Sequence, residues 1–112
     1  MAVVAYTFSL DGVKIYLRAK TWAHVVEEHD EMAGNMDLVL DVINAPDYIL
    51  KGTAGEKVAV KFFEKTSLGP KYVVVPYREI SVDEGFIITA YMMSKQRFNR
   101  FVKGRETLWR RQ

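Results

Sequence analysis

The chain has 112 residues, of which 49% are hydrophobic and 27% charged; its net charge is +2 and it contains no cysteine. This composition is typical of one domain with its own hydrophobic core. The absence of cysteine excludes disulfides, cysteine-ligated zinc, iron–sulfur clusters and a thiol nucleophile. No apolar run approaches the roughly 20 residues that span a bilayer. The first residues lack the pattern of a signal peptide, so we expect a cytoplasmic protein.

The small net charge is the sum of two oppositely charged parts. Residues 95–112 contain seven basic residues and one acidic residue, a net charge of +6, so residues 1–94 carry −4. Such asymmetry is typical of contact with a nucleic acid, a phosphate or an acidic protein partner. A solvated C-terminal segment without a ligand explains the same charges equally well.

The N-terminal part predicts a β-hairpin followed by a helix. Val3–Ser9 and Val13–Arg18 are rich in β-branched and aromatic residues, and Asp11-Gly12 between them is a strong hairpin signal. Thr21 is typical of an N-cap and predicts a helix from Trp22 to about Ala33.

A second helix and a set of strands are expected next. The second helix runs from residue 36 or 37 to Ile43, because Pro46 prevents a longer one. The predicted strands are Tyr48–Lys51, Glu56–Glu64, Lys71–Tyr77 and Phe86–Met92. The short links between the last three predict antiparallel pairing in a meander. The sequence therefore predicts one α+β domain over residues 1–112, with a hairpin and two helices packed on an antiparallel meander sheet of about four strands.

The basic C-terminal segment begins with a helix signal at Ser94. A helix from there places Phe98, Phe101 and Val102 on one face and Arg97, Arg100 and Lys103 on the other, until Gly104 interrupts it. A helix docked onto the domain by this aromatic face is the structural interpretation of the segment, and a phosphate-binding surface is the functional one.

The two histidines belong to the first predicted helix. At 100° per residue, His29 falls within the apolar face and His24 on the opposite face with Glu28 and Glu31. The imidazoles then point about 140° apart and do not bind one metal ion, so we expect no metal and no cofactor. Histidine is also the side chain best suited to proton transfer near pH 7. As structural alternatives, His29 is a hydrogen-bonded core residue and His24 a surface residue paired with Glu28.

The last predicted strand carries further polar candidates. Alternation over residues 86–91 places Ile87, Thr89 and Tyr91 on one face, so the Thr89 hydroxyl and the Tyr91 phenol reach one phosphate or base. Lys61, on an earlier strand, adds positive charge. Ordinary strand propensity explains the same residues without a function.

The order of these motifs resembles the phage-associated branch of the barnase–EndoU–colicin–RelE-like nuclease superfamily. The motifs are the two-histidine segment His24–Glu31, Pro46-Asp47 after a short helix, and the closing strand Ile88–Tyr91. The resemblance extends from about Tyr16 to Trp109, and Asp30 stands where the pattern has a proline.

The resemblance implies a metal-independent ribonuclease, often a toxin or a phage-borne effector. Such an enzyme needs a base for the 2′-hydroxyl, charge stabilisation of the phosphorane and an acid for the leaving 5′-oxygen. Carried over by position, the expected catalytic residues are His24, His29 and Thr89. The residues expected to bind the substrate are Tyr91, Lys61, Arg78 and Arg97.

A second interpretation is a non-catalytic module of the same fold, which binds RNA or an acidic protein through residues 95–112. It predicts salt-sensitive binding without turnover. RNA is the first expected partner, and an inhibitor or antitoxin protein is the second. Catalysis is favoured if His24, Thr89, Tyr91 and a basic residue line one open cleft, and binding or a purely structural role is favoured if they are scattered or buried.

Overall fold

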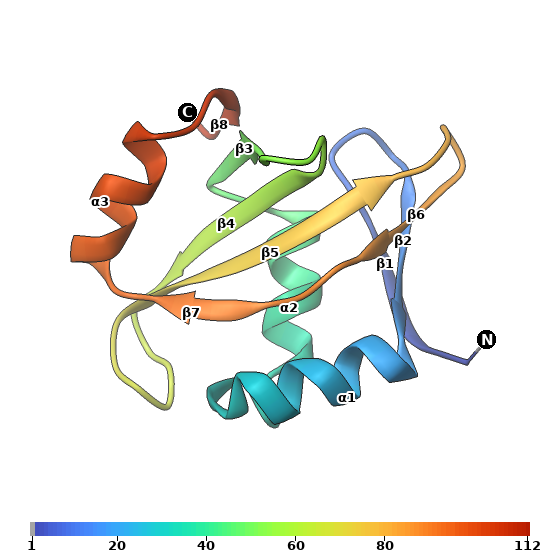
Figure 1. The fold of residues 1–112 in the computed structure, drawn as a ribbon, viewed down its shortest axis with the longest axis horizontal. Helices are drawn as coiled ribbons and strands as arrows, with labels where there is room; N and C mark the ends of the chain where they lie inside the picture. The colour runs from blue at the N-terminus through green and yellow to red at the C-terminus, as the bar shows by residue number, and fades with distance from the viewer. Residues whose placement is uncertain (1) are drawn as a thin grey trace.

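A computed structural model describes residues 2–112, which form three α-helices and a mixed sheet of eight strands (Figure 1). The predicted α+β class is confirmed. In chain order the elements are β1 (Val3–Phe8), β2 (Lys14–Arg18), α1 (Ala19–Glu28), the 3₁₀ helix η1 (Asp30–Met32), α2 (Met36–Asn44), β3 (Tyr48–Lys51), β4 (Lys57–Phe63), β5 (Lys71–Glu79), β6 (Glu84–Ile87), β7 (Tyr91–Met93), α3 (Lys95–Lys103) and β8 (Thr107–Arg110).

The sheet differs from the predicted four-stranded antiparallel meander. Its strand order is β1-β2-β6-β5-β4-β3-β8, and β7 also pairs with β5. Strands β2 and β6 run parallel, with Ile15 opposite Gly85. The hairpin therefore joins β6 through a long crossover that includes α1, α2 and three strands. The prediction missed this pair because it considered only strands that are neighbours in the sequence.

The strand predicted over Phe86–Met92 is in fact two strands separated by a bulge. Ile87 lies opposite Tyr77 of β5, whereas Tyr91 lies opposite Val74. The three residues 88–90 therefore lie opposite only two residues of β5, which is a β-bulge. One of the two is Pro76, which has no backbone N–H to donate to the neighbouring strand. The extra residue reverses the alternation, so Ile87 and Tyr91 lie on opposite faces of the sheet. The prediction that Ile87, Thr89 and Tyr91 share one face is therefore wrong.

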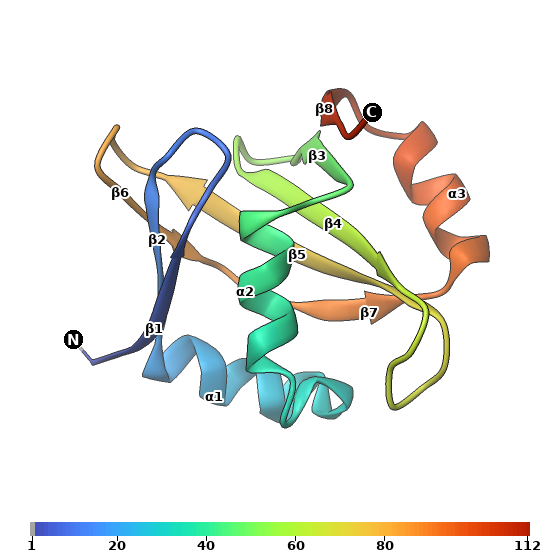
Figure 2. The same cartoon turned by 180° about the vertical axis from the view of Figure 1, so that it is seen from behind.

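The two faces of the sheet carry separate hydrophobic clusters. Figure 2 shows α2 in front of the sheet, and this face holds the larger cluster, with Val25 of α1 and Val39 of α2. On the opposite face Phe98 of α3 packs on Val60 and Val74. The helix predicted for the basic segment is thus docked by its aromatic side, as the structural interpretation expected.

Two helix boundaries position the candidate residues. The first helix ends at Glu28 instead of continuing to Ala33, and His29 leaves the helical region with φ −132° and ψ 70°. This break lets η1 turn and bury Met32 completely. Helix α3 begins where expected, because the Ser94 hydroxyl accepts a hydrogen bond from the Arg97 backbone N–H at 3.2 Å.

The basic segment continues into β8, which pairs with the β3 edge of the sheet. Residues 95–110 are therefore mostly built into the fold as α3 and β8. Within residues 2–112, no helix is both long enough and apolar enough to cross a membrane.

Candidate functional site

An open pocket of about 610 Å³ lies where the end of α1, the 88–90 bulge, β7 and α3 meet. Four of the seven predicted site residues line it: His29, Thr89, Tyr91 and Arg97. The other lining residues are Glu28, Glu31, Met92, Met93 and Phe101. Each predicted residue comes from a different local feature, so the pocket depends on the helix break and on the bulge.

His29 is held between a carboxylate and an aromatic ring. Its Nδ1 lies 3.9 Å from Glu31 Oε2, and its ring centroid lies 5.5 Å from that of Tyr91. Glu31 Oε2 in turn accepts a hydrogen bond from the Met92 backbone N–H at 3.3 Å. The His29 side chain is 35% exposed. A proton on Nδ1 facing Glu31 leaves Nε2 available to exchange a proton with a ligand.

Tyr91 is a hydrogen-bond donor in this pocket. Burial raises the pKa of its phenol, while the positive charges of Arg105 and Arg97 oppose that rise. The phenol therefore keeps its proton at neutral pH and acts as a donor rather than a base.

Arg105 is a functional candidate that the sequence reasoning missed. Its guanidinium lies 3.9 Å above the Phe101 ring, and its Nε is buried without a hydrogen-bond partner among residues 2–112. A buried unpaired donor next to a pocket is uncommon in proteins. Arg105 is one of seven basic residues in residues 95–112, and nothing in the sequence distinguishes it from the others. Its position after Gly104 does not predict that its side chain packs on Phe101.

The other three predicted residues lie outside this pocket. His24 is on the exposed side of α1, with Nδ1 3.7 Å from Glu28 Oε1 and a side chain that is 65% exposed. It lines a separate shallow pocket of about 260 Å³. The Lys61 ammonium lies 2.9 Å from Asp41 Oδ2 of α2. Arg78 donates a hydrogen bond to the Ala54 carbonyl at 3.1 Å.

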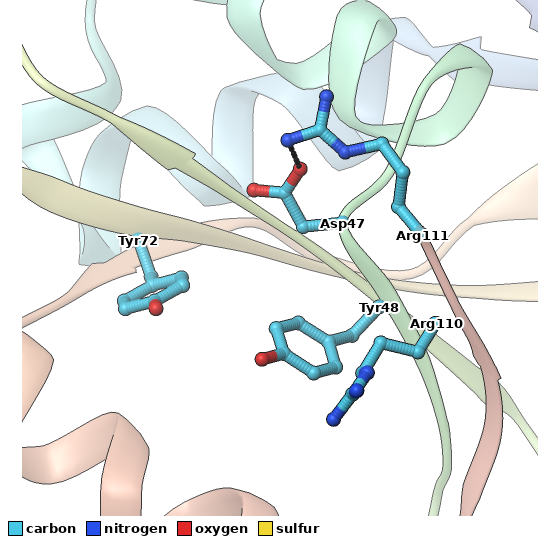
Figure 3. Close-up of a pocket in the computed structure, with 5 residues that line it drawn as sticks. All are labelled: Asp47, Tyr48, Tyr72, Arg110 and Arg111. Atoms are coloured by element: carbon cyan, nitrogen blue, oxygen red, sulfur yellow. Dashed lines mark ion pairs between the residues drawn. The ribbon is translucent and has the colours of Figure 1, made fainter.

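A second polar pocket, of about 340 Å³, lies beside β3 and β8 (Figure 3). Arg111 NH2 lies 2.8 Å from Asp47 Oδ1, while Asp47 Oδ2 accepts the Phe62 backbone N–H at 2.8 Å. Figure 3 shows Tyr48 and Arg110 extending to one side of the strand, and Arg111 turned to the other side toward Asp47. Asp47 thus joins β3, β4 and the end of the chain, with Oδ1 in the ion pair but without a hydrogen bond within residues 2–112.

The donor set of the first pocket does not suit a metal ion. Within the part of the chain that the structure describes, no group of three or more His, Asp or Glu side chains is arranged to hold one. The pocket instead combines an imidazole, two carboxylates, a hydroxyl, a phenol and a guanidinium. These are groups that exchange protons and bind anionic oxygens.

No family model matches the chain, and no curated protein and no solved structure is significantly similar to it. The nuclease resemblance accordingly stays a prediction, and the chemistry of the pocket carries the functional argument.

Proposed function

We propose that the protein is a metal-independent RNA endonuclease of the toxin or phage-effector type, with its catalytic centre in the His29 pocket. The observation that carries this proposal is that His29, Thr89, Tyr91 and Arg97 line one open pocket, in which His29 takes the place expected for His24, a residue that lies outside it. The imidazole moves a proton, and the other three donate to anionic oxygens. This is the set of groups that a phosphodiester cleavage without metal requires.

The proposed reaction is attack of the ribose 2′-hydroxyl on the adjacent phosphorus. Glu28, which lines the pocket rim, accepts the 2′-proton as the new P–O2′ bond forms. The bond to the 5′-oxygen breaks, and protonated His29 donates its Nε2 proton to that oxygen. The products are a 2′,3′-cyclic phosphate and a 5′-hydroxyl.

The remaining groups stabilise charge. The Thr89 hydroxyl and the Arg97 guanidinium donate to the non-bridging oxygens of the phosphorane, where negative charge develops. Glu31 Oε2 lies 3.9 Å from His29 Nδ1 and orients the imidazole so that Nε2 is the nitrogen that faces the leaving group. Glu31 is therefore a positioning residue in this mechanism.

The test compares the two histidines in an RNA cleavage assay with EDTA present. We expect His29→Asn to lower kcat by about 10²–10⁴-fold, the usual contribution of a positioned acid or base. We expect His24→Asn to change it less than about tenfold. A substrate with a 2′-deoxy nucleotide at the cleaved position should remain intact.

The opposite ranking of the histidines would move the catalytic centre to the His24 side of α1. RNA that stays intact with the wild-type protein at high enzyme concentration would overturn the nuclease proposal.

A non-catalytic binding module is the second candidate, and the exposure of one face of α3 favours it. Phe98 is buried against the sheet, whereas Arg97, Arg100 and Lys103 are exposed. Such a row of cations fits RNA or an acidic inhibitor protein. This candidate predicts affinity that falls steeply with salt, and no turnover. Affinity that is unchanged between low and high salt would exclude it.

A further inference from the structure

One end of the sheet has an uncovered face. In residues 2–112, α1 and α2 pack on one face, and α3 packs on the other face near β3, β4 and β7. Figure 1 shows α3 at the left and no helix in front of β1, β2 and β6 at the right. The residues that this open area presents were not part of any predicted site.

Four aromatic side chains gather on this open area. The strand register places Tyr6 opposite Tyr16, and Tyr16 beside Phe86, so all three lie on one face of three adjacent strands. Phe8, two residues after Tyr6, shares that face. Tyr6 is 52% exposed and Phe8 46% exposed. We call Tyr6, Phe8, Tyr16 and Phe86 the aromatic platform.

The rings and the cations beside them suit contact with single bases, each on its own ring. The Tyr6 ring meets Phe8 edge-on, with centroids 6.0 Å and planes 89° apart, and it is tilted by 59° to Tyr16 at 6.5 Å. The Lys14 ammonium lies 4.1 Å from the Tyr6 centroid, and the Arg18 guanidinium lies 4.2 Å from that of Phe86. A base stacked on these rings therefore has its phosphate within reach of a cation.

The platform leads toward the His29 pocket. Arg18 also lines the shallow pocket that contains Lys20, His24 and Ile88. This pocket is a neighbour of the His29 pocket, because His24 Nδ1 lies 3.7 Å from Oε1 of Glu28, which lines the His29 pocket. Arg18 and Lys20 place positive charge between the rings and the His29 pocket.

We propose that the aromatic platform binds single-stranded RNA by stacking on its bases, while Lys14 and Arg18 contact the phosphates. The proposal rests on the proposed function for the identity of the ligand, and it adds that the substrate is unpaired. A duplex hides the faces of its bases, whereas a single strand exposes them.

A second copy of this chain is the other occupant to test, because Val3, Val4 and Leu10 beside the platform are also exposed. Two observations favour RNA. The register of β1 shifts between Val3 and Ala5, and such a bulge hinders edge-to-edge pairing of strands. Cations also lie directly over the rings, and a buried protein interface would have to desolvate them.

The experiment measures binding of a short fluorescent RNA by the His29→Asn variant, so that cleavage does not interfere. Single-stranded RNA should bind at least tenfold more tightly than the same RNA annealed to its complement. Tyr6→Leu keeps apolar surface but removes the ring, and should weaken binding of the single strand by about 5- to 150-fold, the value of one stacked base. Tyr6→Phe should retain affinity.

Trp109→Leu is the matched control. Trp109 is an exposed aromatic residue on β8, the last strand in the order where β1 is the first, and its pocket includes Leu10 of the β1–β2 turn but none of the four platform residues. Its replacement should leave the affinity for the single strand unchanged. Equal loss in the Tyr6→Leu and Trp109→Leu variants, or no loss in Tyr6→Leu, would overturn the platform proposal.

Two further readouts separate this proposal from its alternatives. If Tyr6→Leu changes the oligomeric state by analytical ultracentrifugation and leaves RNA affinity intact, the occupant is a second copy. If the wild type binds single-stranded RNA through the platform but never cleaves it, the nuclease proposal fails and the platform stands. If it cleaves RNA with a KM that Tyr6→Leu does not alter, the platform proposal fails and the nuclease stands.

Discussion

The two polar pockets of this protein each place a carboxylate next to a positively charged or protonatable group, but the pairs differ in exposure and in the elements that they join. The Asp47 side chain is 14% exposed; its Oδ2 accepts the Phe62 backbone N–H at 2.8 Å, and its Oδ1 lies 2.8 Å from Arg111 in an ion pair without a hydrogen bond. In the other pocket, Glu31 Oε2 lies 3.9 Å from His29 Nδ1, and the His29 side chain is 35% exposed.

This difference separates structure from chemistry. The Asp47 pair joins β3 to β4 and to the end of the chain. A partly exposed imidazole beside an open pocket can exchange a proton with a ligand. By this criterion the Pro46-Asp47 motif is structural in this chain, although the nuclease resemblance first drew attention to it. The predictions that follow contrast the two pockets, beginning with the largest expected effect.

After His29→Asn, the largest effect is expected from Thr89→Val, which removes the hydroxyl from the His29 pocket and keeps the shape of the side chain. Loss of one donor to a developing oxyanion lowers kcat by about 10²–10³-fold. Steady-state cleavage of RNA measures this loss, and Thr107→Val on the exposed strand β8 is the matched control. A loss confined to KM would show that Thr89 binds the substrate without stabilising the phosphorane.

Asp47→Ala should affect stability and leave kcat unchanged. The substitution leaves the Phe62 backbone N–H without its acceptor and separates Arg111 from β3. We expect the free energy of unfolding to fall by about 2 kcal/mol, as for other buried polar groups that lose a partner. Urea denaturation measures the change. A large fall in kcat with unchanged stability would contradict the structural role of this pair.

Glu31→Gln should lower kcat and leave stability unchanged, the reverse of Asp47→Ala, and its effect should be smaller. The amide keeps the size of the side chain but loses the charge that faces His29 Nδ1. We expect kcat to fall by up to about fivefold, because such an ion pair is worth at most about 1 kcal/mol. KM and the urea midpoint should not change. An equal loss of stability would mean that Glu31 serves mainly to hold η1 against Met92 of β7.

The local elements of the fold were predictable from short segments. The alternating residues of β4, the Asp11-Gly12 hairpin and the Ser94 cap each lie within a few residues of the structure that they determine. The aromatic face of α3 was equally local, since Phe98 and Phe101 follow the helical period. Predictions of this kind depend on neighbours in the sequence and succeeded for that reason.

The arrangement of the site depended on features that no short segment contains. Thr89 and Tyr91 reach the pocket because a bulge opposite Pro76 adds one residue to their strand, and that pairing connects distant parts of the chain. His29 reaches it because α1 ends at Glu28. The helical wheel assumed a continuous helix, so it assigned His29 to a buried face and did not anticipate its contact with Glu31.

The smallest effect is a shift in the pKa of one tyrosine from each pocket, Tyr91 and Tyr72, and the two shifts are expected to have opposite signs. Burial raises the pKa of Tyr91 and of Tyr72 above the ordinary value of 10.0. The charge of Arg97 opposes this rise at Tyr91, whereas the charge of Asp47 adds to it at Tyr72. Arg97→Gln should therefore raise the pKa of Tyr91, and Asp47→Asn should lower that of Tyr72.

A phenol whose pKa is higher in the folded state stabilises the fold fully below pH 10, and this contribution is lost as pH rises further. Arg97→Gln should accordingly make the loss of stability above pH 10 steeper, and Asp47→Asn should make it shallower. Ultraviolet titration of the phenolate, with Tyr91→Phe and Tyr72→Phe to assign each transition, measures both shifts. Shifts of the same sign in the two variants would show that the pockets do not differ in local charge, and the contrast between them would fail.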